Sequence, residues 1–190
     1  MRDLKDRISI LNKVILNDEI KSKNNGDSNF KIFDYDPEDR YRIEDYITNF
    51  IYDNNKDKII MINLYKTMMD VLKEIDYIDI IIEDEKNNGT AYSNRIVQDV
   101  LGIGTRYDDL IKNKILEIIG ESKNKIIIVY GLEGCYQIVR GHTILSILEP
   151  VITDNSLIMF YPGTYDGQGF KLFNKLENDN GYNASIIASR

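Results

Sequence analysis

The stretch KIIIVYGLEG, residues 125–134, decides the fold that this sequence predicts. Its first part, Lys125–Tyr130, begins with a lysine and continues as a short unbroken apolar run, which is typical of a strand buried on both faces. Gly131 and Gly134 follow the run and predict a tight turn directly after the strand. We expect a helix next, closed by Pro150, with an apolar side made of Ile138, Val139, Leu145 and Leu148.

Further strand patterns occur on both sides of this stretch. They predict strands at Phe30–Asp34, Ile59–Ile62, Ser156–Tyr161 and Ala184–Ala188, with Pro162-Gly163 ending the fourth run. Segments of helical spacing separate these strands, and one of them begins at Asp36-Pro37, a carboxylate cap followed by proline. The alternation predicts an α/β fold, a three-layer sandwich with a mostly parallel sheet covered by helices on both faces.

The chain length predicts one domain. At 190 residues the chain has the size of a single α/β domain, which we expect over residues 1–190. Its first part predicts an N-terminal helix within residues 1–20 and a polar loop at 21–29. Residues 78–119 have a helical pattern, interrupted near 87–89 and 102–104, and the pattern leaves open whether they pack on the sheet or project as an arm.

The composition excludes several function classes. The chain has 24 Lys and Arg against 31 Asp and Glu, so its formal net charge of −7 opposes direct nucleic-acid binding by the chain alone. Cys135 is the only cysteine, which excludes an intrachain disulfide and a Cys-based zinc site. No apolar run is long enough to span a membrane, and the first residues do not resemble a secretory signal, so we expect a cytoplasmic protein without bound metal or cofactor.

Polar residues gather where the predicted strands end, at residues 34–36, 63–65, 131–134 and 161–166. In parallel sheets ligands bind beyond the carboxyl ends of the strands. The sequence therefore predicts a functional edge there.

Asp34 and Asp36 allow two interpretations. An Asp-x-Asp pair after a strand resembles the nucleophile loop of haloacid-dehalogenase-type phosphotransferases, in which one carboxylate attacks phosphorus. In the simpler interpretation, which we favour, Asp36 caps the following helix and Asp34 accepts hydrogen bonds from nearby backbone N–H groups.

The turn at Gly131 and Gly134 is a candidate anion site or only a tight turn. Glycines allow close backbone approach and a helix N-terminus favours an anion, but the G-x-x-x-x-G-K-[S/T] pattern is absent. Arg140, expected on the following helix, either binds phosphate or joins the loops through Asp34, Asp36 or Asp166.

The other polar residues of this edge predict contacts rather than chemistry. We expect His142, the only histidine, to donate to a backbone carbonyl. Tyr161, Tyr165 and Asp166 lie in an aromatic turn that either anchors a loop or docks a protein. Because no nucleophile is paired with a base, we predict no catalytic residue.

The motifs together resemble the BrxB family, an accessory component of the BREX bacteriophage-exclusion systems. The resemblance rests on Phe33-Asp34-Tyr35-Asp36-Pro37, Ile62-Asn63-Leu64-Tyr65, Gly131 with Tyr136, Arg140 and His142, Phe160-Tyr161-Pro162-Gly163 with Tyr165-Asp166-Gly167, Leu172-Phe173, and Asp179-Asn180 with Tyr182 and Ala184. These motifs run in order from the first predicted strand to the C-terminus.

The resemblance implies a small bacterial α/β protein, similar in outline to P-loop-type cores but without Walker motifs. It implies a non-catalytic adaptor that docks to PglZ, the BREX component with an alkaline-phosphatase-like domain. The candidate interface or structural residues are Asp34, Asp36, Tyr136, Arg140, His142, Tyr161, Tyr165 and Asp166, and the candidate anion-binding residues are Gly131, Gly134 and Arg140. The alternative is a phosphate- or nucleotide-binding enzyme or sensor that uses the same loops.

Overall fold

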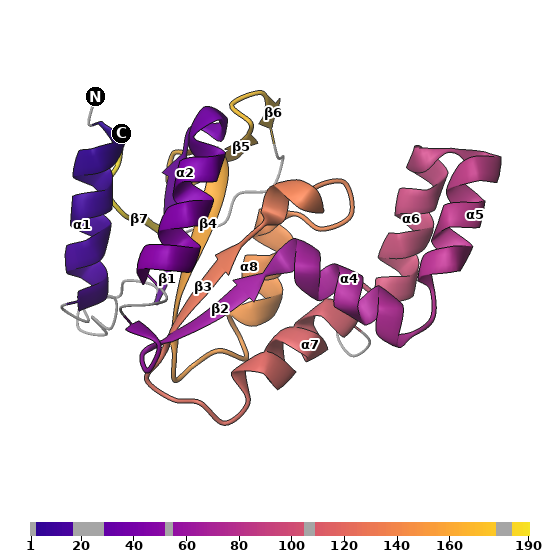
Figure 1. Cartoon of the computed structure of the whole chain (residues 1–190), viewed down its shortest axis with the longest axis horizontal. Coiled ribbons are helices and arrows are strands. Elements are labelled where there is room, and N and C mark those ends of the chain that lie inside the picture. The colour runs from indigo at the N-terminus through magenta and orange to yellow at the C-terminus, as the bar shows by residue number, and fades with distance from the viewer. Residues whose placement is uncertain (1–2, 17–28, 52–54, 105–108, 178–183) are drawn as a thin grey trace.

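The computed structural model describes residues 3–16, 29–51, 55–104, 109–177 and 184–190 (Figure 1). Most of the predicted 21–29 loop and both ends of the predicted 1–20 helix lie outside these residues, as do Asp179, Asn180 and Tyr182 of the family motifs. The N-terminal helix is described as α1, Leu4–Leu16.

The strands form one mostly parallel sheet. Its central order is β2 (Ile59–Asn63), β3 (Ile126–Tyr130), β4 (Ser156–Tyr165), β1 (Phe30–Tyr35) and β7 (Ser185–Ile186), and all neighbours in this order pair in parallel. Two short antiparallel strands, β5 (Phe170–Leu172) and β6 (Leu176–Glu177), extend the carboxyl end of β4. The arrangement is compatible with the P-loop-type outline that the resemblance implies.

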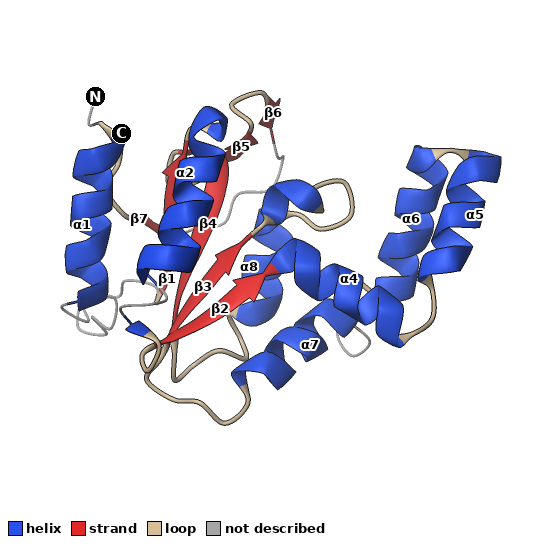
Figure 2. Ribbon diagram, in the orientation of Figure 1, coloured by secondary structure: helices blue, strands red, loops and turns tan. Residues whose placement is uncertain are grey.

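Helices cover both faces of the sheet, which confirms the predicted α/β sandwich (Figure 2). One face carries α1 and α2 (Arg40–Asp45), which continues as the π-helical segment η4 (Tyr46–Ile51). The other face carries α4 (Leu64–Glu74), α7 (Leu110–Ile119) and α8 (Gly141–Leu148).

The central strand β3 shows why the chain folds this way. Ile126 and Ile128 belong to the core under α1 and α2, whereas Ile127 and Val129 belong to the core under α4, α7 and α8. All four are almost fully buried. Because successive strand residues point to opposite faces, a continuous apolar run requires helices on both sides.

Residues 78–119 do both of the things that the sequence left open. Helix α7 packs against α4 and the sheet, but α5 (Ile78–Asn88) and α6 (Thr90–Leu101) form a hairpin at the far end from α1 (Figure 1). The C-terminal half of α6 reaches the core through Val97 and Leu101, whereas α5 has no buried residue.

The predicted helix after β3 is wrong in its first half. A 3-10 turn, η5 (Leu132–Gly134), follows Gly131, and the helix α8 begins only at Gly141. Between them, the carbonyl groups of Gln137 and Ile138 accept hydrogen bonds from Gln98 Nε2 of α6, at 3.0 and 3.1 Å. Gln98 is 39 and 40 residues away in sequence from the two carbonyl groups, so no local sequence pattern could reveal that the helix is interrupted here.

The predicted end of the fourth strand is also wrong. β4 continues through Pro162 and Gly163 to Tyr165, and Pro162 stands opposite Tyr35 of β1. A Cβ at Gly163 would lie 2.2 Å from the carbonyl oxygen of Lys171, so glycine is required because β5 passes at close range. The last strand is shorter than predicted, Ser185–Ile186. Among the described residues, no helix has the length and apolarity needed to cross a membrane.

Candidate functional site

The carboxyl ends of the parallel strands lie at one edge of the sheet, as the sequence predicts. Asp34 stands opposite Tyr161, and Asn63 stands opposite Tyr130. We call residues 34–36, 63–65, 130–134 and 161–166 the strand-tip edge.

Asp34 is a structural residue of this edge. Its side chain is almost fully buried, and its Oδ1 pairs with Arg7 Nη2 of α1 at 2.5 Å. Its Oδ2 accepts a hydrogen bond from the backbone N–H of Tyr165 at 3.2 Å. Burial lowers the pKa of Arg7, and the Asp34 carboxylate opposes that shift. The structure therefore supports the simpler interpretation of Asp34, with all its oxygens engaged inside the protein.

Asp36 is a helix cap, as predicted. Its carboxylate accepts a hydrogen bond from Glu38 N at 3.4 Å, and Pro37 occupies the first helical position of the 3-10 turn η3 (Pro37–Asp39). The C-terminal Arg190 lies beside both aspartates, with Nε 3.5 Å from Asp34 and Nη1 3.9 Å from Asp36. The two ends of the chain thus supply the cations for this pair, not Arg140.

Tyr165 and Asp166 hold backbone in place. The Tyr165 hydroxyl donates to the carbonyl of Ala184 at 3.1 Å and accepts from the N–H of Ala184 at 2.8 Å. Asp166 Oδ1 accepts from the N–H groups of Gln168 and Gly169 at 2.9 and 2.7 Å, and these bonds lower the pKa of the carboxyl. Both side chains anchor the loop between β4 and β5.

Arg140 and His142 lie apart from the aspartates. Arg140 is exposed, precedes α8, and has its guanidinium carbon 5.9 Å from the centre of the Tyr136 ring. His142 is half-buried, and within the described part of the chain its Nδ1 has no hydrogen-bond partner. Burial, assisted by Arg140, lowers its pKa. Among the described residues Arg140 contacts the Tyr136 ring and no aspartate, and His142 Nε2 lies 3.3 Å from Thr143 Oγ1 rather than at a backbone carbonyl. Phosphate binding by Arg140 stays a prediction.

Tyr161 and Tyr136 belong to the same side of the sheet. Tyr161 is fully buried against Phe170, with ring centres 4.9 Å apart, and its hydroxyl has no partner among the residues described. Tyr136 is half-buried and meets Phe173 edge-on at 6.5 Å. Tyr161 therefore presents no group to solvent.

The turn after β3 is filled by protein side chains. Gly131 has a left-handed backbone, with φ of 78°, and a Cβ there would lie 2.6 Å from Asn63 Oδ1. A Cβ at Gly134 would lie 2.9 Å from the Tyr65 ring. The glycines are needed because the first turn of α4 packs onto this loop, which is the tight-turn alternative.

A cavity lies beside this turn, and we call it the strand-tip crevice. Its volume is about 240 Å³, and its charged lining residues are Arg40, Glu44 and Glu133. The remaining lining residues are Tyr35, Ile43, Ile47, Asn63, Tyr65, Tyr130, Gly131 and Gly134. A second cavity, of about 420 Å³, shares Arg40, Glu133 and Gly134 with it and extends to Tyr41, Pro162 and Phe173.

Glu133 is the unusual group of the crevice. Its Oε2 is buried without a hydrogen-bond partner in the described part of the protein. Burial raises the pKa of this carboxyl, a hydrogen bond with its own backbone and the Arg40 charge oppose the shift, and Glu44 adds to it. Burial, with a contribution from Glu133, also raises the pKa of Tyr35. Sequence reasoning missed Glu133, although it lies between the two glycines that the turn prediction singled out.

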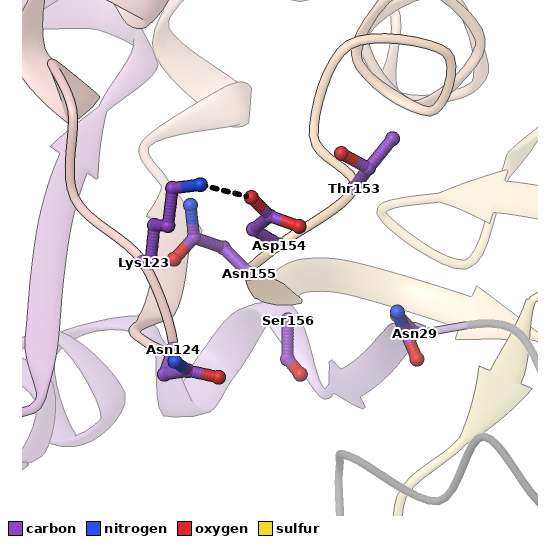
Figure 3. A pocket seen from close by; sticks show the side chains of 7 residues that line it. All are labelled: Asn29, Lys123, Asn124, Thr153, Asp154, Asn155 and Ser156. Carbon is purple, nitrogen blue, oxygen red and sulfur yellow. Dashed lines mark ion pairs between the residues drawn. The ribbon is translucent and has the colours of Figure 1, made fainter.

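Another cavity lies at the opposite edge of the sheet, at the start of β3 and β4 (Figure 3). Its volume is about 420 Å³, and Lys123 and Asp154 point toward each other across it in a 3.1 Å ion pair. The Asn155 side chain joins two segments there: its Oδ1 accepts a hydrogen bond from the backbone N–H of Lys125, and its Nδ2 donates one to the carbonyl of Ser122, both at 2.9 Å. These side chains are used to hold loops together.

Residues suited to hold a metal do not come together: the described ranges contain no group of three or more His, Cys, Asp or Glu that could bind one. Cys135 is buried, and burial raises the pKa of its thiol to about 12. A cysteine of this kind is not a nucleophile at neutral pH, because the thiolate is the reactive form.

Known proteins that are similar to this chain share one description. The family described as BREX protein BrxB matches residues 60–187. A BREX protein BrxB of Bacillus cereus (strain H3081.97) is 31% identical over 158 residues, which cover 82% of this chain and 81% of that protein. A BREX protein BrxB of Escherichia coli O9:H4 (strain HS) is 27% identical over 173 residues, covering 89% and 84%. No solved structure matches the chain significantly. The chain therefore belongs to the BrxB family of BREX proteins.

Proposed function

We propose that this BREX component is a non-catalytic adaptor of the bacterial anti-phage system, acting in the cytoplasm and docking through its strand-tip edge to PglZ. Family membership supports the BREX assignment. The observation that carries the adaptor role is the contrast between Asp34 and Asp166, whose carboxylates are bonded to the protein, and the exposed rings of Tyr41 and Tyr65, which line the cavities at this edge.

Two carboxylates of the edge, those of Asp34 and Asp166, hold the fold in place. Asp34 is bound by Arg7 and by the N–H of Tyr165, and Asp166 is bound by two backbone N–H groups. These bonds fix both carboxylates as anchors of backbone and of Arg7. Together with the buried thiol of Cys135, this arrangement favours an interface over a reaction centre.

The aromatic groups face solvent. Tyr41 is 74% exposed and Tyr65 is 45% exposed, and both line the cavities of the edge. Tyrosine is enriched at the centres of protein interfaces, because it buries a large rigid area at small entropic cost. An exposed pair beside a crevice is therefore suited to a protein partner.

Co-expression with the cognate PglZ and gel filtration test this proposal. We expect the two proteins to elute together at micromolar concentration. Tyr41→Ala should weaken the complex, whereas Tyr92→Ala should leave it unchanged, because Tyr92 is also exposed but lies on the α5–α6 hairpin. Elution as separate species would contradict the adaptor role.

The alternative, a phosphate- or nucleotide-binding enzyme or sensor, makes a different prediction. A ligand present at one hundred times its dissociation constant stabilises a protein by about 2.7 kcal/mol, which thermal melting detects easily. We expect ATP, GTP and Mg²⁺ to leave the melting temperature unchanged. A clear shift, or phosphatase turnover, would favour the alternative.

A further inference from the structure

The charges of the strand-tip crevice are unbalanced. Glu44 and Glu133 contribute two carboxylates to its lining, and Arg40 contributes the only cation among the lining residues. The Arg40 guanidinium carbon lies 4.6 Å from the centre of the Tyr41 ring, so the cation is held over an aromatic face at the mouth of the second cavity. An anionic ligand would meet a net negative wall in the crevice, whereas a cation would be attracted.

Glu133 also lacks a partner for one oxygen. Its Oε2 is shielded from water and receives no hydrogen bond from the described residues. Because this oxygen makes no hydrogen bond in place with the described residues, the carboxylate loses little when it turns toward a donor in the crevice, and a charged donor gives the strongest bond. The raised pKa of this carboxyl agrees with a charge that the protein itself leaves incompletely compensated.

The other walls suit the same kind of ligand. Tyr35, Tyr65 and Tyr130 contribute aromatic rings to the lining. Ammonium and guanidinium groups bind favourably over tyrosine faces within about 6 Å. Aromatic rings beside carboxylates are therefore chemically matched to the side chain of lysine or arginine.

The size and surroundings of the crevice indicate how this cation arrives. The crevice, of about 240 Å³, has room for one side chain, and it shares Arg40, Glu133 and Gly134 with the second cavity of about 420 Å³. The exposed rings of Tyr41 and Tyr65 beside it offer area to a protein surface rather than to a small free cation.

We propose that the strand-tip crevice is the receptor for one basic side chain, an arginine or a lysine, presented by the protein that docks at the strand-tip edge. The Glu133 carboxylate turns to accept hydrogen bonds from the inserted group, which lies beside the tyrosines of the lining. This inference rests on the proposed adaptor function and adds the chemistry by which the partner is recognised.

The partner complex provides the first test. Glu133→Gln removes the charge and keeps the shape, so the dissociation constant of the complex with PglZ, measured by calorimetry, should rise at least tenfold. Glu44→Gln should have a smaller effect in the same direction. Glu121→Gln is the control, because Glu121 is exposed before β3, at the opposite edge of the sheet, and should leave the affinity unchanged. Equal affinity of the Glu133→Gln and wild-type chains would overturn the inference.

A pair of small probes tests the crevice without the partner. N-acetyl-arginine amide should perturb the ring resonances of Tyr130 and Tyr35 in the full chain, whereas N-acetyl-citrulline amide, its neutral counterpart, should not. The perturbation should be lost in Glu133→Gln. Equal effects of the two probes, or no effect of the arginine probe at tens of millimolar, would contradict a cation receptor.

The outcomes separate the two proposals. If PglZ does not bind the wild-type chain, the adaptor role fails, and the arginine and citrulline titration still decides whether the crevice binds a cation. If PglZ binds and Glu133→Gln has no effect, only the receptor inference fails. Spermidine, a free polyamine, is a further probe. If it binds the wild-type chain at micromolar concentration and Glu133→Gln leaves the affinity for PglZ unchanged, the crevice binds a free polyamine and the inference is overturned.

Discussion

Replacing Arg7 by methionine would remove the cation that joins both ends of the chain to the sheet. The guanidinium pairs with Asp34 Oδ1 at 2.5 Å, donates to Asp34 O and to Ala188 O at 2.6 Å each, and lies 4.9 Å from the centre of the Phe33 ring. Methionine keeps much of the apolar stem but leaves a buried carboxylate and two carbonyl groups without their donor.

The expected cost follows from this geometry. Removing one partner of a buried ion pair costs about 3–5 kcal/mol, because the remaining charge is left uncompensated. Arg190 Nε remains 3.5 Å from Asp34 Oδ2 and offsets part of the loss. We therefore expect a loss of about 3 kcal/mol in the free energy of unfolding. For a chain of this length that loss corresponds to a melting temperature lower by roughly 6–12 °C.

Urea denaturation and thermal melting of Arg7→Met measure this loss. The control is Arg42→Met, which removes an exposed ion pair with Asp39 at 2.8 Å and should cost no more than about 0.5 kcal/mol. The double variant Arg7→Met/Asp34→Asn should be less destabilised than the sum of the single variants, because the two side chains interact directly. A loss below about 1 kcal/mol for Arg7→Met, or strict additivity, would refute the assigned role of the pair.

Three further perturbations have defined outcomes. Gly134→Ala should lower the free energy of unfolding, measured by urea denaturation, by about 1–3 kcal/mol, because the new Cβ would lie 2.9 Å from the Tyr65 ring. Gly169→Ala is the control and should cost less, because the atom nearest to its Cβ would be 3.7 Å away. Equal losses in the two variants would contradict the packing argument. The pKa of Glu133 is raised in the folded state, so folding favours its protonated form, and stability falls as pH rises from the unfolded value, about 4.5, through the folded value. Glu133→Gln should therefore melt above the wild type at neutral pH, with the difference vanishing below about pH 4.5; a lower melting temperature at pH 7 would refute it. Cys135 should resist alkylation at pH 8 in the native protein and react after denaturation, because burial raises its pKa to about 12; rapid native labelling would contradict this.

Where local sequence decides local structure, prediction succeeded. The run after Lys125 is a strand because β-branched residues favour a pleated surface, and Asp36-Pro37 starts a helical turn because a carboxylate and a proline suit its first positions. Helix α5 lies within the segment of predicted helical pattern, because good helix formers follow its apolar start.

Where bonding partners are far apart in sequence, prediction failed. The helix before Gly141 is interrupted because Gln98 binds two carbonyl groups there. β4 runs past Pro162 because β1 pairs with it on one side and β5 approaches Gly163 closely. In each case a tertiary contact outweighs the local propensity of the chain.

The site divides in the same way. The strand-tip edge was predictable, because parallel strands that end in polar residues must bring those residues to one edge. The crevice was not, since Tyr35, Glu44, Tyr65 and Glu133 come from four separate segments and become neighbours only after folding. No spacing rule connects these positions.

The amino-acid sequence by itself determined the α/β class, the parallel sheet and the edge at which polar residues collect. These properties follow from hydrophobic periodicity, which acts over a few residues and repeats along the chain. Only the tertiary structure decided which charges meet: Arg7 and Arg190, from the two ends of the chain, compensate Asp34, whereas Glu133 keeps an oxygen that none of the described residues binds. The physical reason is that electrostatic and hydrogen-bond partners are chosen by distance in space, which sequence separation does not encode.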